Sequence, residues 1–264
     1  LPISHGMFQS VYDYPYLSSS ANHIFDLSVG VSANSGLLGG AGAAMTGAKS
    51  DLYNELCQMV CGYDVTGSLL ELDVSGNFTP RATYVEGSTM RHVFIINFAR
   101  LLSKDEIQPA SGSFVMKLGV TEDYEAPFAK KVTVFDKDGT AGIKNNSPAG
   151  DFNILYGTAS YTGGSRLAST ADNKLGVGLI FYQAGIAVVT ASVFMNSLTD
   201  AGADSEMPDK TGTGRTLFTA ETLLSNANIS GACNALRSRI FDIDFNNTTE
   251  LNSTIYFCRA NRTE

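Results

Sequence analysis

The chain has 264 residues, of which 44% are hydrophobic and 17% charged, and its formal net charge is −8. This length corresponds to one large all-β or α/β domain, or to two small ones, with enough apolar residues for a sizeable core. The acidic surplus disfavours binding to nucleic acid and to anionic lipid, which are themselves polyanions. With 26 glycines and many Ser, Thr and Asn residues, the composition indicates a β-rich chain with many turns.

The first ninety residues predict one long strand and one helix. Residues 23–34, "HIFDLSVGVSAN", alternate as a strand does. Residues 49–62, "KSDLYNELCQMVCG", predict a short helix, with Ser50 or Asp51 as its N-cap and Gly62 as its terminator. Its expected buried stripe has helical spacing and consists of Leu52, Leu56, Met59 and Val60.

A glycine-rich segment at 35–47 joins this strand to this helix. Small residues make such a segment easy to bend and costly to order, so we expect it to order only against a neighbouring chain. We take it as a candidate assembly arm, whose defining residues are Gly36, Leu37, Leu38, Gly39, Gly40, Gly42, Met45 and Gly47.

The same segment resembles a phosphate-binding P-loop, G-x-x-x-x-G-K-[ST], with one residue too many. Gly42 and Gly47 have the required spacing, but Ala48 separates Gly47 from Lys49. One extra helical residue turns the lysine by about 100°, away from the phosphates. The hairpins expected later in the chain also differ from the alternating strands and helices of a nucleotide-binding fold. We therefore predict a plain glycine-rich connection.

The remainder of the chain is expected to be mostly β. A short helix at 101–107 carries a Ser103–Glu106 capping-box pair, and the Asp138-Gly139 dipeptide predicts a tight hairpin within 130–144. Residues 218–239 are partly helical in pattern. Further strands are expected at 92–99, at 112–120, at 151–161 and as a pair around an Asn/Thr-rich turn within 240–260. The polar stretch 197–214 is expected to be an exposed or mobile loop.

Residues 175–195, "LGVGLIFYQAGIAVVTASVFM", contain no charged residue. This length could cross a membrane as a helix. A buried hairpin from Val177 to Phe194, turning at Gln183–Gly185, explains the β-branched and glycine content better. We predict the hairpin.

The four cysteines are Cys57, Cys61, Cys233 and Cys258. Their spacing is poor for zinc, and Cys57 and Cys61 share one helix face, where a disulfide does not fit. Four buried, reduced thiols are expected, which fits assembly in a reducing cytoplasm. The N-terminal "LPISHGMFQS" lacks the features of a signal peptide.

Other potential sites are weak in sequence, and no cofactor, metal or catalytic residue is expected. The "DKDG" motif starting at Asp136 lacks later ligands of a calcium loop. The histidines show no metal spacing, and His23 and His92 are expected as polar residues at strand starts. Asp242 and Asp244 alternate with apolar residues, as on a strand with one wet face.

Residues 90–264 resemble virion structural proteins of T-even-like myoviruses, notably marine phages that infect cyanobacteria. The resemblance rests on "VFIINFARLLSKDEI", "GSFVMKLG", "NILYGTASYTG", "GVGLIFYQAGIAVVT" and "STIYFCRANRTE". In that family an "FNYS…NP" segment commonly follows, and this sequence stops at Glu264 where that segment would begin, as a fragment would. The first ninety residues carry no such resemblance.

The expectation is a mainly β, antiparallel β-sandwich-like protein with two or three short helices. Residues 1–90 form an N-terminal region, and 91–264 form a β-rich domain that is either separate from it or continuous with it. The resemblance implies a non-enzymatic structural component of a contractile-tailed phage, in the tail or baseplate, assembled in the host cytoplasm. Its expected partners are copies of itself and other virion proteins, without nucleic acid or membrane. The alternatives are a head, neck or decoration protein and a carbohydrate-binding tail protein.

Overall fold

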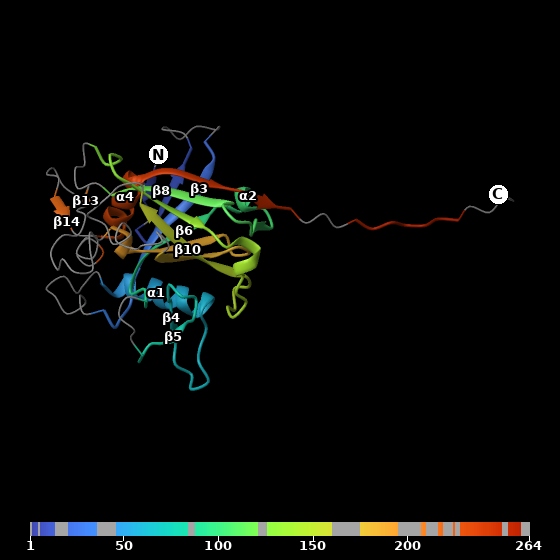
Figure 1. Cartoon of the computed structure of the whole chain (residues 1–264), viewed down its shortest axis with the longest axis horizontal. Coiled ribbons are helices and arrows are strands. Elements are labelled where there is room, and N and C mark those ends of the chain that lie inside the picture. The colour runs from blue at the N-terminus through green and yellow to red at the C-terminus, as the bar shows by residue number, and fades with distance from the viewer. Residues whose placement is uncertain are drawn as a thin grey trace.

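A ten-stranded antiparallel sheet forms the body of the protein (Figure 1). The computed structural model describes residues 2–4, 6–13, 21–35, 46–83, 88–120, 126–159, 175–194, 207–209, 216–218, 224, 228–249 and 253–259. The strand order is β1-β2-β3-β6-β12-β11-β10-β9-β8-β15. This mainly β, sandwich-like architecture confirms the predicted fold class.

The strands of this sheet are β1 (Pro2–Ser4), β2 (Gln9–Tyr12), β3 (His23–Val31), β6 (His92–Phe98), β8 (Phe114–Gly119), β9 (Lys131–Asp136), β10 (Phe152–Ala159), β11 (Leu175–Phe181), β12 (Ile186–Thr190) and β15 (Ile240–Phe245). Three two-stranded pairs accompany it: β4 (Leu70–Glu71) with β5 (Thr79–Pro80), β7 (Glu106–Ile107) with β16 (Asn247–Thr248), and β13 (Met207–Asp209) with β14 (Thr216–Phe218). The helices are α1 (Thr46–Val60), α2 (Arg100–Ser103) and α4 (Ile229–Arg239), with 3-10 turns η3 (Gly139–Gly142) and η4 (Ala191–Phe194).

The central strands are buried on both faces, and two apolar cores result. On β6, Phe94 and Ile96 belong to the larger core, whereas Val93 and Ile95 belong to the smaller one. The sheet curls around the larger core, so that Phe98 of β6 contacts Phe114 of β8 at a ring-centroid distance of 5.8 Å. Helix α4 also contributes to this core, whereas α1 packs over the smaller core on the opposite face.

Helix α1 lies close against β3 because β3 has a glycine where the two elements meet. A Cβ atom on Gly30 would lie only 3.1 Å from Cβ of Tyr53. The helix starts at Thr46, so Ser50 and Asp51 lie inside it and the predicted N-cap is wrong. Its end is as predicted, since Gly62 has a φ of +77°, the left-handed conformation that terminates helices.

The buried stripe of α1 differs in part from the predicted one. Leu56 and Val60 are buried as expected, but Met59 is 47% exposed. Tyr53 and Cys57 are fully buried in its place. The true stripe is therefore rotated by about 60° around the helix axis from the predicted one and shares Leu56 and Val60 with it.

The uncharged run at 175–195 forms the predicted hairpin. Strands β11 and β12 pair antiparallel, with Phe181 opposite Ile186. Gly185 closes the turn with a φ of +66°. Beyond Thr190 the chain turns into η4 instead of continuing as a strand. In the described part of the chain, no helix has the length and apolar character needed to cross a membrane.

The predicted tight hairpin at Asp138-Gly139 is wrong. Strands β9 and β10 do pair, but η3 and a longer connection lie between them. The turn instead forms around Asp136, a fully buried carboxylate. This carboxylate accepts hydrogen bonds from the Gly139 amide at 3.0 Å, Asn153 Nδ2 at 3.2 Å and the Tyr182 hydroxyl at 2.5 Å. Three protein donors therefore hold the carboxylate that headed the weak calcium motif.

Two further local expectations are wrong. Helix α2 ends at Ser103 and its N-cap is Ala99, which makes no side-chain cap bond, so Ser103 and Glu106 form no capping box. Phe241 is 51% exposed, packs edge-on against Phe128 and lies under the Lys131 ammonium, at the point where β15 shifts register between Ile240 and Asp242. The strand therefore has a less regular apolar face than its alternation predicts.

The division of the chain at residue 90 is not a division of the main sheet. Strand β3 from the first part pairs with β6 along its length, from Phe25 opposite Phe98 to Val31 opposite His92. Consequently the sheet continues across the predicted boundary.

Candidate functional site

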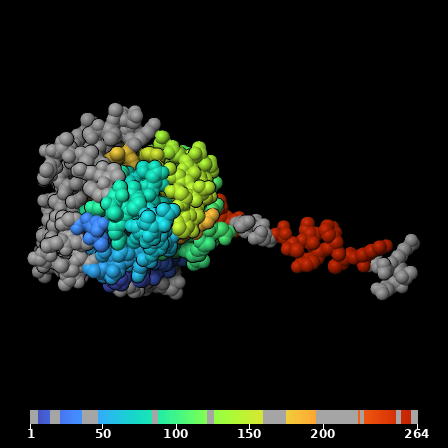
Figure 2. Space-filling view, turned by 90° about the horizontal axis from the view of Figure 1, so that it is seen from below, coloured from blue at the N-terminus to red at the C-terminus, as the bar shows by residue number. Residues whose placement is uncertain are grey.

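Residues 253–259, Ser-Thr-Ile-Tyr-Phe-Cys-Arg, form an extended segment that stands clear of the body (Figures 1 and 2). We call it the C-terminal segment. Its three large apolar side chains are strongly exposed: Ile255 by 75%, Tyr256 by 84% and Phe257 by 93%. The second strand predicted within 240–260 is therefore wrong, because this strand-like sequence has no ladder partner in the described chain.

An apolar groove of about 380 Å³ lies on the outer face of the sheet beside α1. Leu52 and Met59 of α1 form one side, and Met7 and Phe8 of the β1–β2 connection lie on the other. Met7, Phe8 and Met59 are 42%, 37% and 47% exposed, respectively. The groove exists because α1 covers only part of this face of β3 and β6.

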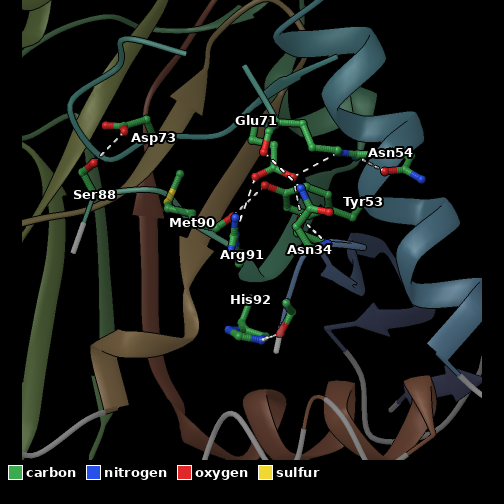
Figure 3. Close-up of polar contacts among 12 residues, drawn as sticks. Asn34, Tyr53, Asn54, Glu71, Asp73, Ser88, Met90, Arg91 and His92 are labelled. Carbon is green, nitrogen blue, oxygen red and sulfur yellow. Dashed lines mark hydrogen bonds and ion pairs between the residues drawn. The ribbon is translucent and has the colours of Figure 1, made fainter. Parts of the chain in front are cut away.

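A buried polar cluster lies under α1 (Figure 3). Its centre is Glu71, which is only 1% exposed. The Glu71 carboxylate accepts hydrogen bonds from the Ser32 hydroxyl at 2.5 Å and from Arg81 Nε at 3.2 Å. Arg91 Nε lies 3.8 Å from the other carboxylate oxygen, which makes this contact an ion pair. Arg81 also donates to the Asn54 side chain on α1.

Polar contacts beside this cluster secure the segment that precedes β6. The Tyr53 hydroxyl donates to the Met90 carbonyl at 2.7 Å. The Asp73 carboxylate accepts from the hydroxyls of Ser75 and Ser88 at 2.6 and 2.8 Å. Apart from the local Asp73–Ser75 bond, these contacts join separate segments, so the cluster fixes α1, β4 and the residues just before β6 relative to each other. Within the described ranges, no group of three His, Cys, Asp or Glu residues could hold a metal ion.

His92 heads β6 as expected and lies 2.6 Å from the Ser35 hydroxyl through Nε2. Burial, and secondarily the Arg91 charge, lower the pKa of His92 to about 4. A serine and a neutral imidazole in contact could in principle form a nucleophile and its base. In the fold, this contact joins the chain just after β3 to the start of β6.

We expect His92 to make the protein acid-sensitive. The folded pKa of about 4 lies below the ordinary value of 6.5, so the unfolded state binds more protons between these values. Stability should fall as the pH drops from about 6.5 to 4, by about 3 kcal/mol from this group. Urea unfolding of the wild type and of His92→Gln across this range measures it. The two stabilities should converge at low pH, and parallel profiles would show that His92 does not contribute.

Of the candidate assembly arm, only Gly47 lies within the described residues. Gly47 is an exposed residue of the first turn of α1. Gly36, Leu37, Leu38, Gly39, Gly40, Gly42 and Met45 lie outside the described residues, as does most of the polar stretch 197–214. The predicted ordering of this arm against a neighbour stays a prediction.

Lys49, the lysine of the P-loop-like motif, is fully buried. Its ammonium donates to the Leu224 carbonyl at 2.5 Å, and burial lowers its pKa to about 8. A side chain in this position is not available to a phosphate at the surface. This agrees with the prediction that the lysine points away from any phosphate cradle.

All four cysteines are unpaired, as predicted, but their exposure differs. Cys57, Cys61 and Cys233 are buried, and Cys258 in the C-terminal segment is exposed, which corrects the expectation of four buried thiols. Burial raises the pKa of Cys233 to about 12 and also raises that of Cys61.

In the native protein, we expect a thiol-reactive dye to label Cys258 rapidly and the three buried thiols slowly. The thiolate is the reactive form, and burial both blocks access and suppresses its formation. After denaturation without reductant, four thiols per chain should react. Two or none would mean that disulfides form.

Comparison of the chain with protein-family models, with curated proteins and with solved structures finds no significant match. The chemistry of the C-terminal segment and of the groove is therefore the basis for a functional proposal. Sequence reasoning missed both as sites. The β-branched and aromatic run at Ile255–Phe257 was a signal that could have identified the segment. The groove was missed because Met59, which lines it, was expected to be buried.

Proposed function

We propose that this chain is a structural subunit that acts by protein–protein assembly, as a component of a contractile-tailed phage particle in the tail or baseplate. The observation that carries the assembly role is the exposure of Ile255, Tyr256 and Phe257. Runs of three or more exposed apolar residues are unfavourable in water and are kept where they bind a partner.

The chemistry of the segment suits docking on another protein. β-Branched and aromatic residues favour extended backbone, and an extended segment can offer both its backbone groups and alternate side chains to a partner. Tyr256 and Phe257 would bury large areas on docking. The body itself is held by two apolar cores, so the segment is free to serve an intermolecular role.

The assignment to a phage tail or baseplate is supported by the resemblance of residues 90–264 to virion proteins of T-even-like myoviruses. A head, neck or decoration protein of the same particle would use the same segment in the same way. A carbohydrate-binding tail protein would need aromatic side chains on one rigid face, whereas Tyr256 and Phe257 lie on an extended segment.

Replacing Ile255, Tyr256 and Phe257 together by serine tests this function. Particles should incorporate the wild-type chain and exclude the triple variant, as measured by mass spectrometry of purified particles. The melting temperature of the isolated chain should stay unchanged, because the segment lies away from the body. Equal incorporation of both chains would contradict the assembly role.

A further inference from the structure

The C-terminal segment and the groove are similar in length. An extended chain rises about 3.3 Å per residue, so Ile255 to Arg259 span about 13 Å. The helix stretch from Leu52 to Met59 that lines the groove spans about 10 Å. The segment can therefore lie along the exposed length of α1.

The alternation of the segment divides its side chains into two rows. Ile255, Phe257 and Arg259 share one side, because residues two apart in an extended chain point the same way. Two apolar side chains followed by one cation would thus enter the groove together. Tyr256 and Cys258 point to the opposite side.

The groove combines apolar side chains with carboxylates, which suits a row of two apolar side chains and one cation. Its floor includes Ile95 and Ile186, and methionines on its sides adapt to aromatic side chains. Two carboxylates, Glu55 on α1 and Asp26 on β3, also line it. Glu55 is exposed and suited to receive a guanidinium such as that of Arg259, whereas Asp26 already contacts Ser10 and His23.

We propose that the C-terminal segment of one chain docks in the groove beside α1 of a second copy of this chain. Ile255 and Phe257 then lie against the apolar floor, and Arg259 pairs with Glu55. This inference rests on the proposed assembly function and names the partner of its docking segment. A second copy is favoured over the segment's own body, because the segment stands clear of that body (Figure 2).

Crosslinking from the native Cys258 tests the location directly. A thiol-reactive photo-crosslinker is attached to the exposed thiol in an equal mixture of unlabelled and heavy-nitrogen-labelled full-length chains. We expect mixed-label crosslinks that map to α1 and to the Met7–Phe8 turn. Crosslinks only within one label would show that the segment folds back on its own chain, and crosslinks elsewhere on a second copy would exclude the groove.

Charge reversal tests the contact that sets the register. Glu55→Arg and Arg259→Glu should each weaken self-association roughly three- to tenfold, measured by sedimentation velocity, because each places like charges together. The double variant should restore it to within about twofold of wild type. Asp244→Arg makes the same charge change at an exposed residue of β15 that does not line the groove, and it should change little. No rescue in the double variant would overturn the pairing.

Substitutions on the two sides of the segment should affect self-association differently. Phe257→Ser should weaken self-association roughly ten- to a hundredfold, from the lost burial of one large apolar side chain. Tyr256→Ser, on the opposite side, should have a smaller effect, and the reverse order would exclude this docking. If the triple serine variant is excluded from particles while none of the groove variants matters, the assembly function stands and this partner is wrong.

Discussion

Val188→Asp should abolish soluble expression or lower the free energy of unfolding by several kcal/mol. Val188 is fully buried in β12, between Ile95 of β6 and Leu179 of β11. A carboxylate there would be desolvated among apolar side chains without a cation or donor, which is among the most destabilising changes in a core. Urea unfolding or, for insoluble protein, the soluble fraction measures the effect.

Two variants separate the buried charge from other causes. Val188→Thr has nearly the same shape and adds only a hydroxyl, so it should cost less. Leu101→Asp introduces a carboxylate at a position that is 81% exposed and should change stability by no more than about 0.5 kcal/mol. A soluble Val188→Asp protein within about 1 kcal/mol of wild type would mean that this hairpin is not buried as described.

Glu71→Ala should lower the free energy of unfolding by about 3 kcal/mol. The change removes the carboxylate that joins Ser32, Arg81 and Arg91, and it leaves two guanidinium groups near one another without their common anion. Both arginine side chains retain some solvent, with exposures of 24% and 18%, so the loss stays below that of a fully buried network.

Glu71→Gln is the matched control, because it keeps the shape and one acceptor oxygen but removes the charge. We expect it to cost about half as much as alanine in urea unfolding. If alanine and glutamine variants were both as stable as wild type, the cluster in Figure 3 would not hold α1 and β4 to the sheet.

Local patterns predicted elements well where burial decides the structure. The hairpin of β11 and β12 follows from an uncharged, β-branched run with Gly185 at its turn, because a strand buried on both faces needs no alternation. The existence and the C-terminal end of α1 follow from its periodicity and from Gly62. Its start was predicted too late, because Ser50 and Asp51 are residue types that commonly cap a helix but here lie inside α1.

Features that depend on distant residues were beyond sequence reasoning. Glu71, Arg81 and Arg91 come from separate segments with no shared periodicity, and their convergence is a product of the sheet. The Asp138-Gly139 dipeptide has the residues of a tight turn, but the donors around Asp136 select a longer connection. The C-terminal segment has strand propensity, yet a strand needs a partner, and the described chain supplies none.

An electron cryomicroscopy reconstruction of a particle that contains this chain tests the central claim most directly. The account predicts that residues 253–259 are ordered and buried against another chain, with Ile255 and Phe257 facing it. A reconstruction that shows this segment exposed to solvent, or a particle that lacks the chain, would contradict it.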